Sequence, residues 1–262
     1  MVAADVGRPD LSGRVIVVTG ASRGIGKGLA IGLAQLGAAV VCAARSEIEK
    51  PGGLPGTIHD TVREIEASGA TGIAIRCDIG EEADIHDLVD QTVARFGRLD
   101  VLVNNAMAPT QVLLAESTVD EWDQSMRVNV RSLFVFTRAV TPHMVAGGGG
   151  SIVNISSHGA AHETTPFMPA GYLIYSVAKA ALERFTSAAA PELAPLGISI
   201  NALRPGAVKT EMTELEFGPD ADWSGWATPQ SVVPPVAALA AHAGGAFTGQ
   251  ILDVAGFGRS WS

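Results

Sequence analysis

Cysteine is scarce in this sequence, which has only two, Cys42 and Cys77, among 262 residues. Two thiols in short apolar runs cannot form the disulfide framework on which small secreted proteins depend. We therefore expect both side chains to be buried in strands. A reducing compartment, the cytoplasm, is the expected location.

Basic charge is also scarce, since 18 Lys and Arg stand against 27 Asp and Glu and the formal net charge is −9. Nucleic-acid binding needs a basic surface, so the composition argues against that class of partner. No uncharged apolar stretch reaches the ~18 residues of a membrane span, and residues 1–14 hold no apolar segment typical of a secretory signal. The expected partner is a small molecule, with neither nucleic acid nor membrane involved.

The six histidines give little sign of a metal site. His158, His162 and Glu163 lie close together in the sequence, but no third well-placed ligand and no dependable helix accompany them. A structural metal site needs about four ligands. We therefore interpret them as loop residues and expect no metal.

What the sequence does have is an alternation of short apolar runs with longer amphipathic ones. This order predicts an α/β fold whose strands are buried on both faces. The expected strands are 14–19, 39–43, 73–77, 100–103, 151–155, 198–202 and 250–254. The expected helices are 29–36, 57–67, 84–96, 122–145, 175–194 and 228–242. One domain over residues 1–262, a doubly wound (Rossmann) parallel sheet of about seven strands with helices on both faces, accounts for this order.

The first predicted strand leads directly into a glycine-rich turn that contains Gly20, Gly24 and Gly26. Gly20 permits a sharp bend, Gly24 lets the backbone approach a pyrophosphate, and Gly26 lets the next helix pack closely against its strand. Free N–H groups at the start of that helix would then bind the phosphates. The spacing G-x-x-x-G-x-G differs from the dinucleotide fingerprint G-x-G-x-x-G, and an ordinary strand-to-helix turn is the alternative.

Arg45 follows Gly26 by nineteen residues, at a place where an acidic side chain would hold the ribose 2′-hydroxyl of NAD(H). A guanidinium pairs with a phosphate instead. Arg45, with Arg23 as a second contact, therefore favours NADP(H) over NAD(H). The alternative is that Arg45 is a solvated loop residue.

Tyr175 and Lys179 lie four residues apart at the start of an Ala-rich apolar run. In a helix this spacing puts both side chains on one face. The pKa of an unperturbed phenol is near ~10, and a nearby cation favours the phenolate and lowers that pKa. We expect the Lys179 ammonium and a cationic cofactor ring to lower the pKa of Tyr175 in this way. A surface pair in which the lysine extends over its neighbour is the alternative.

Seven short motifs occur in order along nearly the whole chain. They are Thr19-Gly20-x-x-x-Gly24-x-Gly26, Cys77-Asp78-Ile79, Asn104-Asn105-Ala106, Asn129, Ser157, Tyr175-x-x-x-Lys179 and Pro205-Gly206-Ala207-Val208-Lys209-Thr210. In this combination the sequence resembles the classical short-chain dehydrogenase/reductase family. The resemblance implies a reversible hydride transfer between a nicotinamide and a carbonyl or secondary alcohol.

The resemblance also implies roles for individual residues. Tyr175 would be the general acid in reduction and the base in oxidation, and Lys179 would lower its pKa and bind the nicotinamide ribose. Ser157 would hydrogen-bond the substrate oxygen, with Ser156 as the competing candidate. Asn129 would anchor a water relay to Lys179. The implied cofactor-binding residues are Gly20, Ser22, Arg23, Gly24, Ile25, Gly26, Arg45, Asp78, Ile79, Asn105, Ala106, Tyr175, Lys179, Pro205, Gly206, Val208 and Thr210.

Three features depart from the usual family pattern. Met107 stands where the family usually has glycine, and the loops 46–56 and 158–174 are longer than in most members. The first of these loops and the helix after it resemble the hydroxysteroid-dehydrogenase-like branch.

Apolar side chains gather in the segment 207–227, which by resemblance caps the substrate. The expected substrate-binding residues are Met107, Phe167, Met168, Met212 and Phe217, and Leu215, Trp223 and Trp226 extend the same apolar set. These residues predict a bulky apolar ketone or alcohol as substrate. Packing in the core or between subunits is the alternative.

Two further expectations concern the chain as a whole. A catalytically silent NADP(H)-binding sensor or scaffold is the alternative function, although such a chain would be expected to lack Tyr175 or Lys179. Relatives pair their long central helices, and the Ala-rich run 178–194 would allow a close approach of two helices. We therefore expect a homodimer or homotetramer.

Overall fold

A parallel sheet forms the centre of the computed structural model, which describes residues 9–49, 51–162, 169–218, 220–242, 244 and 246–262. Its seven strands lie in the order β3-β2-β1-β4-β5-β6-β7, and every neighbouring pair is parallel. The strands are β1 Val15–Thr19, β2 Ala39–Ala44, β3 Thr71–Arg76, β4 Val101–Asn104, β5 Gly150–Ile155, β6 Ile198–Arg204 and β7 Ile251–Asp253. The doubly wound sheet predicted from the sequence is confirmed.

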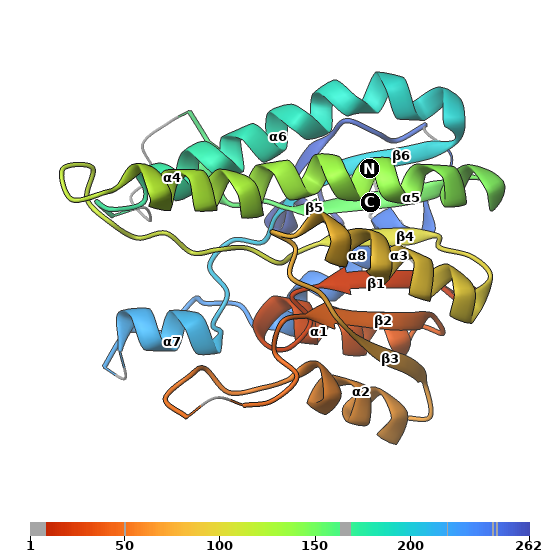
Figure 1. The fold of residues 1–262 in the computed structure, drawn as a ribbon, viewed down its shortest axis with the longest axis horizontal. Helices are drawn as coiled ribbons and strands as arrows, with labels where there is room; N and C mark the ends of the chain where they lie inside the picture. Colours follow the sequence, from red (N-terminus) through yellow and green to blue (C-terminus); the bar gives the residue numbers. More distant parts are fainter. Residues whose placement is uncertain (1–8, 50, 163–168, 219, 243, 245) are drawn as a thin grey trace.

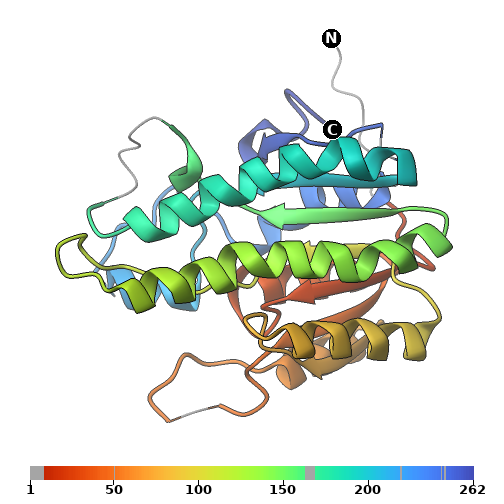
Figure 2. The same cartoon turned by 45° about the horizontal axis from the view of Figure 1, so that its top comes forward.

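Helices cover both faces of the sheet (Figures 1 and 2). One layer holds α1 Gly24–Ala34, α2 Ile58–Ala67 and α8 Val233–Ala241, and the other holds α3 Glu82–Phe96, α5 Ser132–Ala146 and α6 Leu173–Leu193. Along β1, Ile16 and Val18 face the first layer and Val17 faces the second. This alternation explains why a strand buried on both faces is apolar at every position.

The bounds of several helices differ from the sequence prediction, and α1 and α3 begin at Gly24 and Glu82, before the expected residues 29 and 84. The expected helix 122–145 is α4 Val119–Met126, a π-helical turn Arg127–Arg131 and then α5. The expected helix 228–242 begins with a 3-10 turn, Pro229–Val232, because the two prolines at the start of α8 are tolerated only in a first turn. The helix that carries Tyr175 begins two residues earlier, at Leu173.

The segment 207–227 contains a short helix, α7 Glu211–Phe217, that the sequence analysis did not predict. Thr210 caps it by accepting a hydrogen bond from the N–H of Thr213. In Figure 1, α7 and the loop 46–56 extend from the same end of the molecule. These two segments follow β6 and β2, so this end is the carboxyl edge of the sheet.

The carboxyl edge is where the fold places a ligand site. β1 lies between β2 and β4, so the chain leaves β1 and β4 toward opposite sides of the sheet. In doubly wound folds, ligands bind in the crevice at this point of reversal. The edge collects the glycine turn after β1 and the segments that follow β4, β5 and β6.

Both cysteines are free and buried, Cys42 in β2 and Cys77 directly after β3. Burial raises the pKa of each thiol to about 12. Among the residues that the structure describes, no helix is long and apolar enough to cross a membrane.

Candidate active site

The glycine turn after β1 packs so closely against its neighbours that side chains at Gly20 and Gly26 would clash with them. Gly20 and Gly24 have positive φ angles of 69° and 54°, and a Cβ on Gly20 would lie 2.9 Å from the Cα of Ala106. A Cβ on Gly26 would lie 2.2 Å from the carbonyl oxygen of Gly20. Gly24 faces Thr210, whose Cγ2 would lie 3.3 Å from a Cβ there. The turn thus presents N–H groups at the start of α1, which fits the phosphates of a dinucleotide.

Thr19 and Asn105 hold the end of β4 against this turn. The Thr19 hydroxyl accepts hydrogen bonds from the N–H groups of Asn105 and Ala106, both at 3.0 Å. The Asn105 amide in turn donates to the carbonyl of Thr19 at 2.9 Å. Thr19 received no role in the sequence analysis, although a buried polar residue that ends an apolar strand was a usable signal.

Arg45 and Asp78, both predicted to bind the cofactor, lie together. Arg45 is the first residue after β2, and its Nη1 lies 3.7 Å from Oδ2 of Asp78. The Arg45 side chain is 66% exposed, so its charge is accessible to a ligand. Ile79, in contrast, packs against the core beneath the edge.

Arg23 holds the loop 46–56 against the glycine turn. Its Nε donates to the carbonyl of Pro55 at 2.8 Å, and its Nη2 donates to the carbonyls of Leu54 and Gly56 at 3.1 and 2.9 Å. The sequence analysis did not predict this structural role of Arg23. It fixes the long loop beside the predicted phosphate site.

A cavity of about 890 Å³ lies between that loop, α2 and α7. Its polar lining includes the Thr57 and Asp60 capping pair of α2 and the carboxylate of Glu211. Ser22 of the glycine turn also lines it, but neither Ser157 nor Tyr175 does. The cavity therefore adjoins the predicted phosphate site and is separate from the predicted site of the chemistry.

Lys179 is buried and tied to the end of β5. Its Nζ donates a hydrogen bond of 2.7 Å to the carbonyl of Ile155 and lies 5.8 Å from the centre of the Tyr175 ring. The Tyr175 phenol lies close to the hydroxyl of Ser157, which acts to lower the pKa of the phenol. The structure therefore brings Ser157, Tyr175 and Lys179 together, and the helical spacing predicted the pairing of Tyr175 with Lys179.

The direction of the pKa shift on Tyr175 is opposite to our expectation. Desolvation raises the pKa of the phenol, and the nearby Ser157 hydroxyl offsets only part of the increase. The lysine cation is directed to the Ile155 carbonyl, and desolvation lowers the pKa of Lys179 to about 8. In the protein alone, burial outweighs the effect of Ser157, and Lys179 does not lower the pKa of the phenol as expected. The lowering by a cationic cofactor ring stays a prediction.

The serines at the end of β5 point to different partners. Ser156 is buried and its hydroxyl donates to Oε1 of Glu183 at 2.7 Å. The Ser157 hydroxyl contacts Tyr175 and accepts a hydrogen bond from the N–H of Gly159 at 3.1 Å. Ser157 is thus the serine that lies beside the phenol.

Asn129 lies in the π-helical turn between α4 and α5. Its side-chain oxygen accepts a hydrogen bond from the N–H of Ala108 at 2.9 Å, and its Nδ2 donates to the Ala108 carbonyl and the Ser125 hydroxyl at 3.0 Å each. These bonds anchor the segment that follows β4. The water relay to Lys179 stays a prediction.

Between β6 and α8 the chain folds back on itself. Pro205 and Gly206 leave β6, and buried Val208 pairs with Ala227 in a short parallel bridge. Phe217 packs edge-on against Trp223 and Trp226, with ring centres 6.5 and 5.4 Å apart.

The remaining predicted substrate residues are less defined. Met107 and Met212 are half-buried, and Ile25 packs against the core below the glycine turn. Phe167 and Met168 lie outside the described residues.

His158 faces a carboxylate, with Nε2 at 2.8 Å from Oδ1 of Asp253. Within the described ranges, no group of three or more His, Cys, Asp or Glu residues could hold a metal ion.

Comparison with known proteins decides the family. A model of the family described as short chain dehydrogenase matches residues 14–218. The chain belongs to the short-chain dehydrogenase family. It is 36% identical to a 3-oxoacyl-[acyl-carrier-protein] reductase of Synechocystis over 94% of this chain and 97% of that protein. It is 32% identical to an NADPH-dependent aldehyde reductase-like protein of Arabidopsis thaliana, with 94% of each chain covered.

Solved structures of other short-chain dehydrogenases agree with this assignment. A short chain dehydrogenase from Burkholderia cenocepacia in complex with NADP matches with a TM-score of 0.80 and 31% identity, covering 93% of this chain and 97% of that one. A putative NAD(P)-dependent gluconate 5-dehydrogenase from Beutenbergia cavernae with bound NADP matches with a TM-score of 0.81 and 31% identity, covering 95% and 97%. Nothing in these matches points specifically to the hydroxysteroid-dehydrogenase-like branch.

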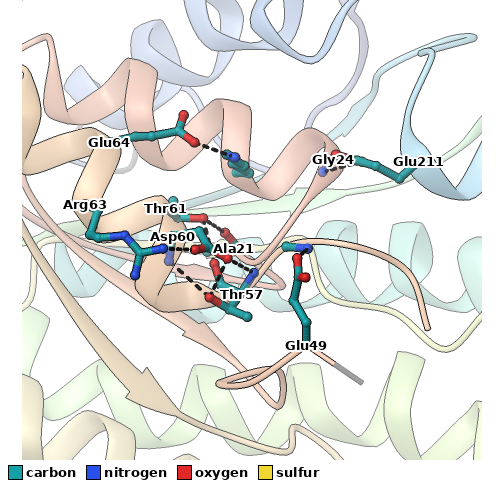
Figure 3. A network of polar contacts seen from close by, with 11 residues as sticks. Ala21, Gly24, Glu49, Thr57, Asp60, Thr61, Arg63, Glu64 and Glu211 are labelled. Atoms are coloured by element: carbon teal, nitrogen blue, oxygen red, sulfur yellow. Dashed lines mark hydrogen bonds and ion pairs between the residues drawn. The ribbon is translucent and has the colours of Figure 1, made fainter. Parts of the chain in front are cut away.

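Glu211 occupies the glycine turn that a short-chain dehydrogenase offers to its dinucleotide. Its Oε2 accepts a hydrogen bond of 3.0 Å from the N–H of Gly24 (Figure 3). A carboxylate at this position competes with a phosphate for the same donor and repels its charge. Glu211→Gln is therefore expected to tighten NADPH binding by about 3- to 10-fold, or ~1 kcal/mol, measured by fluorescence titration.

Glu214→Gln is the matched control, because it removes the same charge from α7, where Glu214 pairs with Lys209 at 3.1 Å. Its affinity for NADPH should stay at the wild-type value. Equal tightening in both variants would show that the net charge of α7, and not the contact with Gly24, is responsible.

Proposed function

We propose that this chain is an NADP(H)-dependent oxidoreductase that transfers a hydride between the nicotinamide and the carbonyl or secondary alcohol of a bulky apolar substrate. The observation that carries the proposal is the contact of the Tyr175 phenol with Ser157, one helical turn from buried Lys179 at the carboxyl edge. Family membership supports the reaction class. The glycine turn fits the dinucleotide on geometric grounds.

The protein residues manage the proton that accompanies the hydride. When bound, the nicotinamide gives or takes the hydride. Ser157 and Tyr175 are two donors directed at one substrate oxygen, where negative charge develops during reduction. Desolvation keeps the phenol protonated at neutral pH, so Tyr175 is ready to donate its proton to that oxygen. In oxidation, the phenolate takes the proton back, and the Lys179 ammonium stabilises it.

Tyr175→Phe is the direct test of this role. The variant lacks the proton donor, so kcat/KM for carbonyl reduction should fall by roughly 10²–10⁴-fold while NADPH still binds. Tyr172→Phe is the control, because Tyr172 packs edge-on against Tyr175 at 5.9 Å and shares its helix terminus. Equal activity in Tyr175→Phe and wild type would contradict the proposal. NADPH binding with no turnover of any carbonyl, in the wild type and Tyr175→Phe alike, would favour the silent sensor.

The choice of NADP(H) rests on Arg45. Its exposed guanidinium follows β2 at the position where NAD-dependent relatives of this fold hold a ribose hydroxyl with a carboxylate. Two similar structures contain NADP. To form a bidentate pair with the 2′-phosphate, the Arg45 guanidinium would have to leave Asp78 and bind the phosphate.

Arg45→Asp should lower kcat/KM with NADPH by about 10- to 100-fold, because the carboxylate repels the 2′-phosphate that the guanidinium attracts. The value with NADH should rise or stay constant. Arg76→Gln controls for the loss of a cation at the end of the adjacent strand, where Arg76 pairs with Asp84 at 2.7 Å. A wild-type preference for NADH that Arg45→Asp leaves unchanged would overturn the assignment.

An apolar substrate is proposed from the segment 207–227, which we propose to be the substrate cap. Its aromatic side chains gather at the carboxyl edge, where Phe217 is 44% exposed and Leu215 is 71% exposed. Burial of apolar substrate surface against such side chains would favour binding. In a matched series of ketones, kcat/KM should rise with apolar size, and a flat series would reject this part of the proposal.

We also propose that the chain forms a homodimer or homotetramer. α5 and α6 run side by side on the outside of one helix layer (Figures 1 and 2). Phe134 on α5 and Val177 on α6 are 56% and 41% exposed, which suits burial against a second copy.

A further inference from the structure

Three side chains of α6 face three consecutive residues at the end of β5. Tyr175, Lys179 and Glu183 are spaced four apart and so share one face of the helix. Tyr175 lies close to Ser157, Lys179 donates to the carbonyl of Ile155, and Glu183 accepts from Ser156. The first two contacts belong to the proposed chemistry. The third has no role in it.

Glu183 is also joined to the end of β6. Its Oε1 accepts from Nε of Arg204, and its Oε2 accepts from Nη2, both at 2.7 Å. The two side chains are only 11% and 21% exposed. Arg204 is the last residue of β6 and directly precedes Pro205 and Gly206. One carboxylate therefore connects α6, the end of β5 and the start of the predicted cofactor-binding segment.

The charges around this pair are few and identifiable. Lys179 lies one turn before Glu183 on the same helix, and the negative charge of Glu183 acts to raise the pKa of Lys179. Asp253, at the end of β7, raises the pKa of Arg204 through its negative charge. It is also hydrogen-bonded to His158, the residue after Ser157. Ser157 thus lies between two residues that are each hydrogen-bonded to an acidic side chain, Ser156 to Glu183 and His158 to Asp253.

The arrangement favours a function in positioning over one in stability. A buried ion pair must compensate the loss of hydration of both charges, and apolar residues of equal volume often stabilise a protein as well or better. The carboxylate of Glu183 is placed where it acts on two groups of the site at once, the serine before Ser157 and the ammonium of Lys179.

We propose that Glu183, held by Arg204, is a positioning residue that fixes Ser156, and through it Ser157, and keeps the Lys179 ammonium charged for the transfer. The proposal rests on the proposed function. Desolvation lowers the pKa of Lys179 to about 8, and the negative charge of Glu183 opposes that decrease. Without Glu183, Lys179 would lose its proton at a lower pH.

Glu183→Gln tests the proposal, because glutamine keeps an acceptor for Ser156 and loses the charge. For carbonyl reduction, kcat should fall by about 10- to 100-fold with KM and NADPH affinity nearly unchanged, and the basic limb of the pH profile should move to lower pH. The double variant Glu183→Leu with Arg204→Met removes both charges of the pair. Because no unpaired charge is left buried, this variant is expected to fold even if Glu183→Gln does not. It should show the same kinetic changes, and wild-type kinetics in this folded double variant would overturn the proposal.

A titration that needs no turnover separates this proposal from the proposed function. The sequence has four lysines, so ¹³C-lysine NMR can follow Lys179, with Lys179→Met for assignment. The midpoint of Lys179 should be lower in both variants than in the wild type. An unchanged midpoint contradicts the proposal even if no carbonyl substrate is found. Arg98→Met breaks the Arg98 pair with Asp100 near the amino end of β4 and should change neither the titration nor the kinetics.

Discussion

The Lys179 ammonium is a cation inside the protein, and the hydrogen bond from it to the Ile155 carbonyl decides how the site is built. A buried charge without an acceptor is strongly unfavourable, so the lysine must stay in contact with the end of β5. That contact fixes the first two turns of α6 against the carboxyl edge of the sheet. Tyr175, one turn earlier, then reaches Ser157 two residues beyond the anchored carbonyl. One polar contact thus sets the relative position of Tyr175, the proposed proton donor, and Ser157.

The parallel sheet supplies the rest of the site by bringing distant segments to one edge. Backbone N–H groups of the glycine turn, the Arg45 guanidinium after β2 and the Thr210 region after β6 all lie there because every strand points the same way. Opposite charges accompany the cations, with Asp78 beside Arg45, Glu183 beside Arg204 and Glu211 at the glycine turn. In the protein alone, Asp78 and Glu211 therefore occupy contacts that the phosphates of the proposed cofactor would need. Binding of an anionic cofactor must rearrange some of these contacts.

The fold was predictable because its signals are local and periodic. Strands that are apolar at every position, glycines at a turn that excludes any Cβ, and a tyrosine and lysine one turn apart each follow from short stretches of sequence. The π-helical turn at Arg127–Arg131 and helix α7 were not predicted, because both are short and the cap at Thr210 is the main local signal for α7. The bonds of Arg23 to the loop 46–56 and of Glu183 to Arg204 join residues far apart in the sequence. The direction of the pKa shift of Tyr175 was not predicted for a related reason. It depends on burial and on where the Lys179 side chain points, and sequence spacing determines neither.

The central claim is that the surroundings of Tyr175 hold its phenol protonated until a cationic nicotinamide lies beside it. The chain has only two tyrosines, so Tyr172→Phe leaves a single phenol whose ionisation can be followed by ultraviolet difference absorption. The account predicts a pKa above the ordinary phenol value of about 10 in the protein alone, and a decrease when NADP⁺ is added. A pKa at or below that ordinary value without cofactor, or no change when NADP⁺ binds, would contradict it.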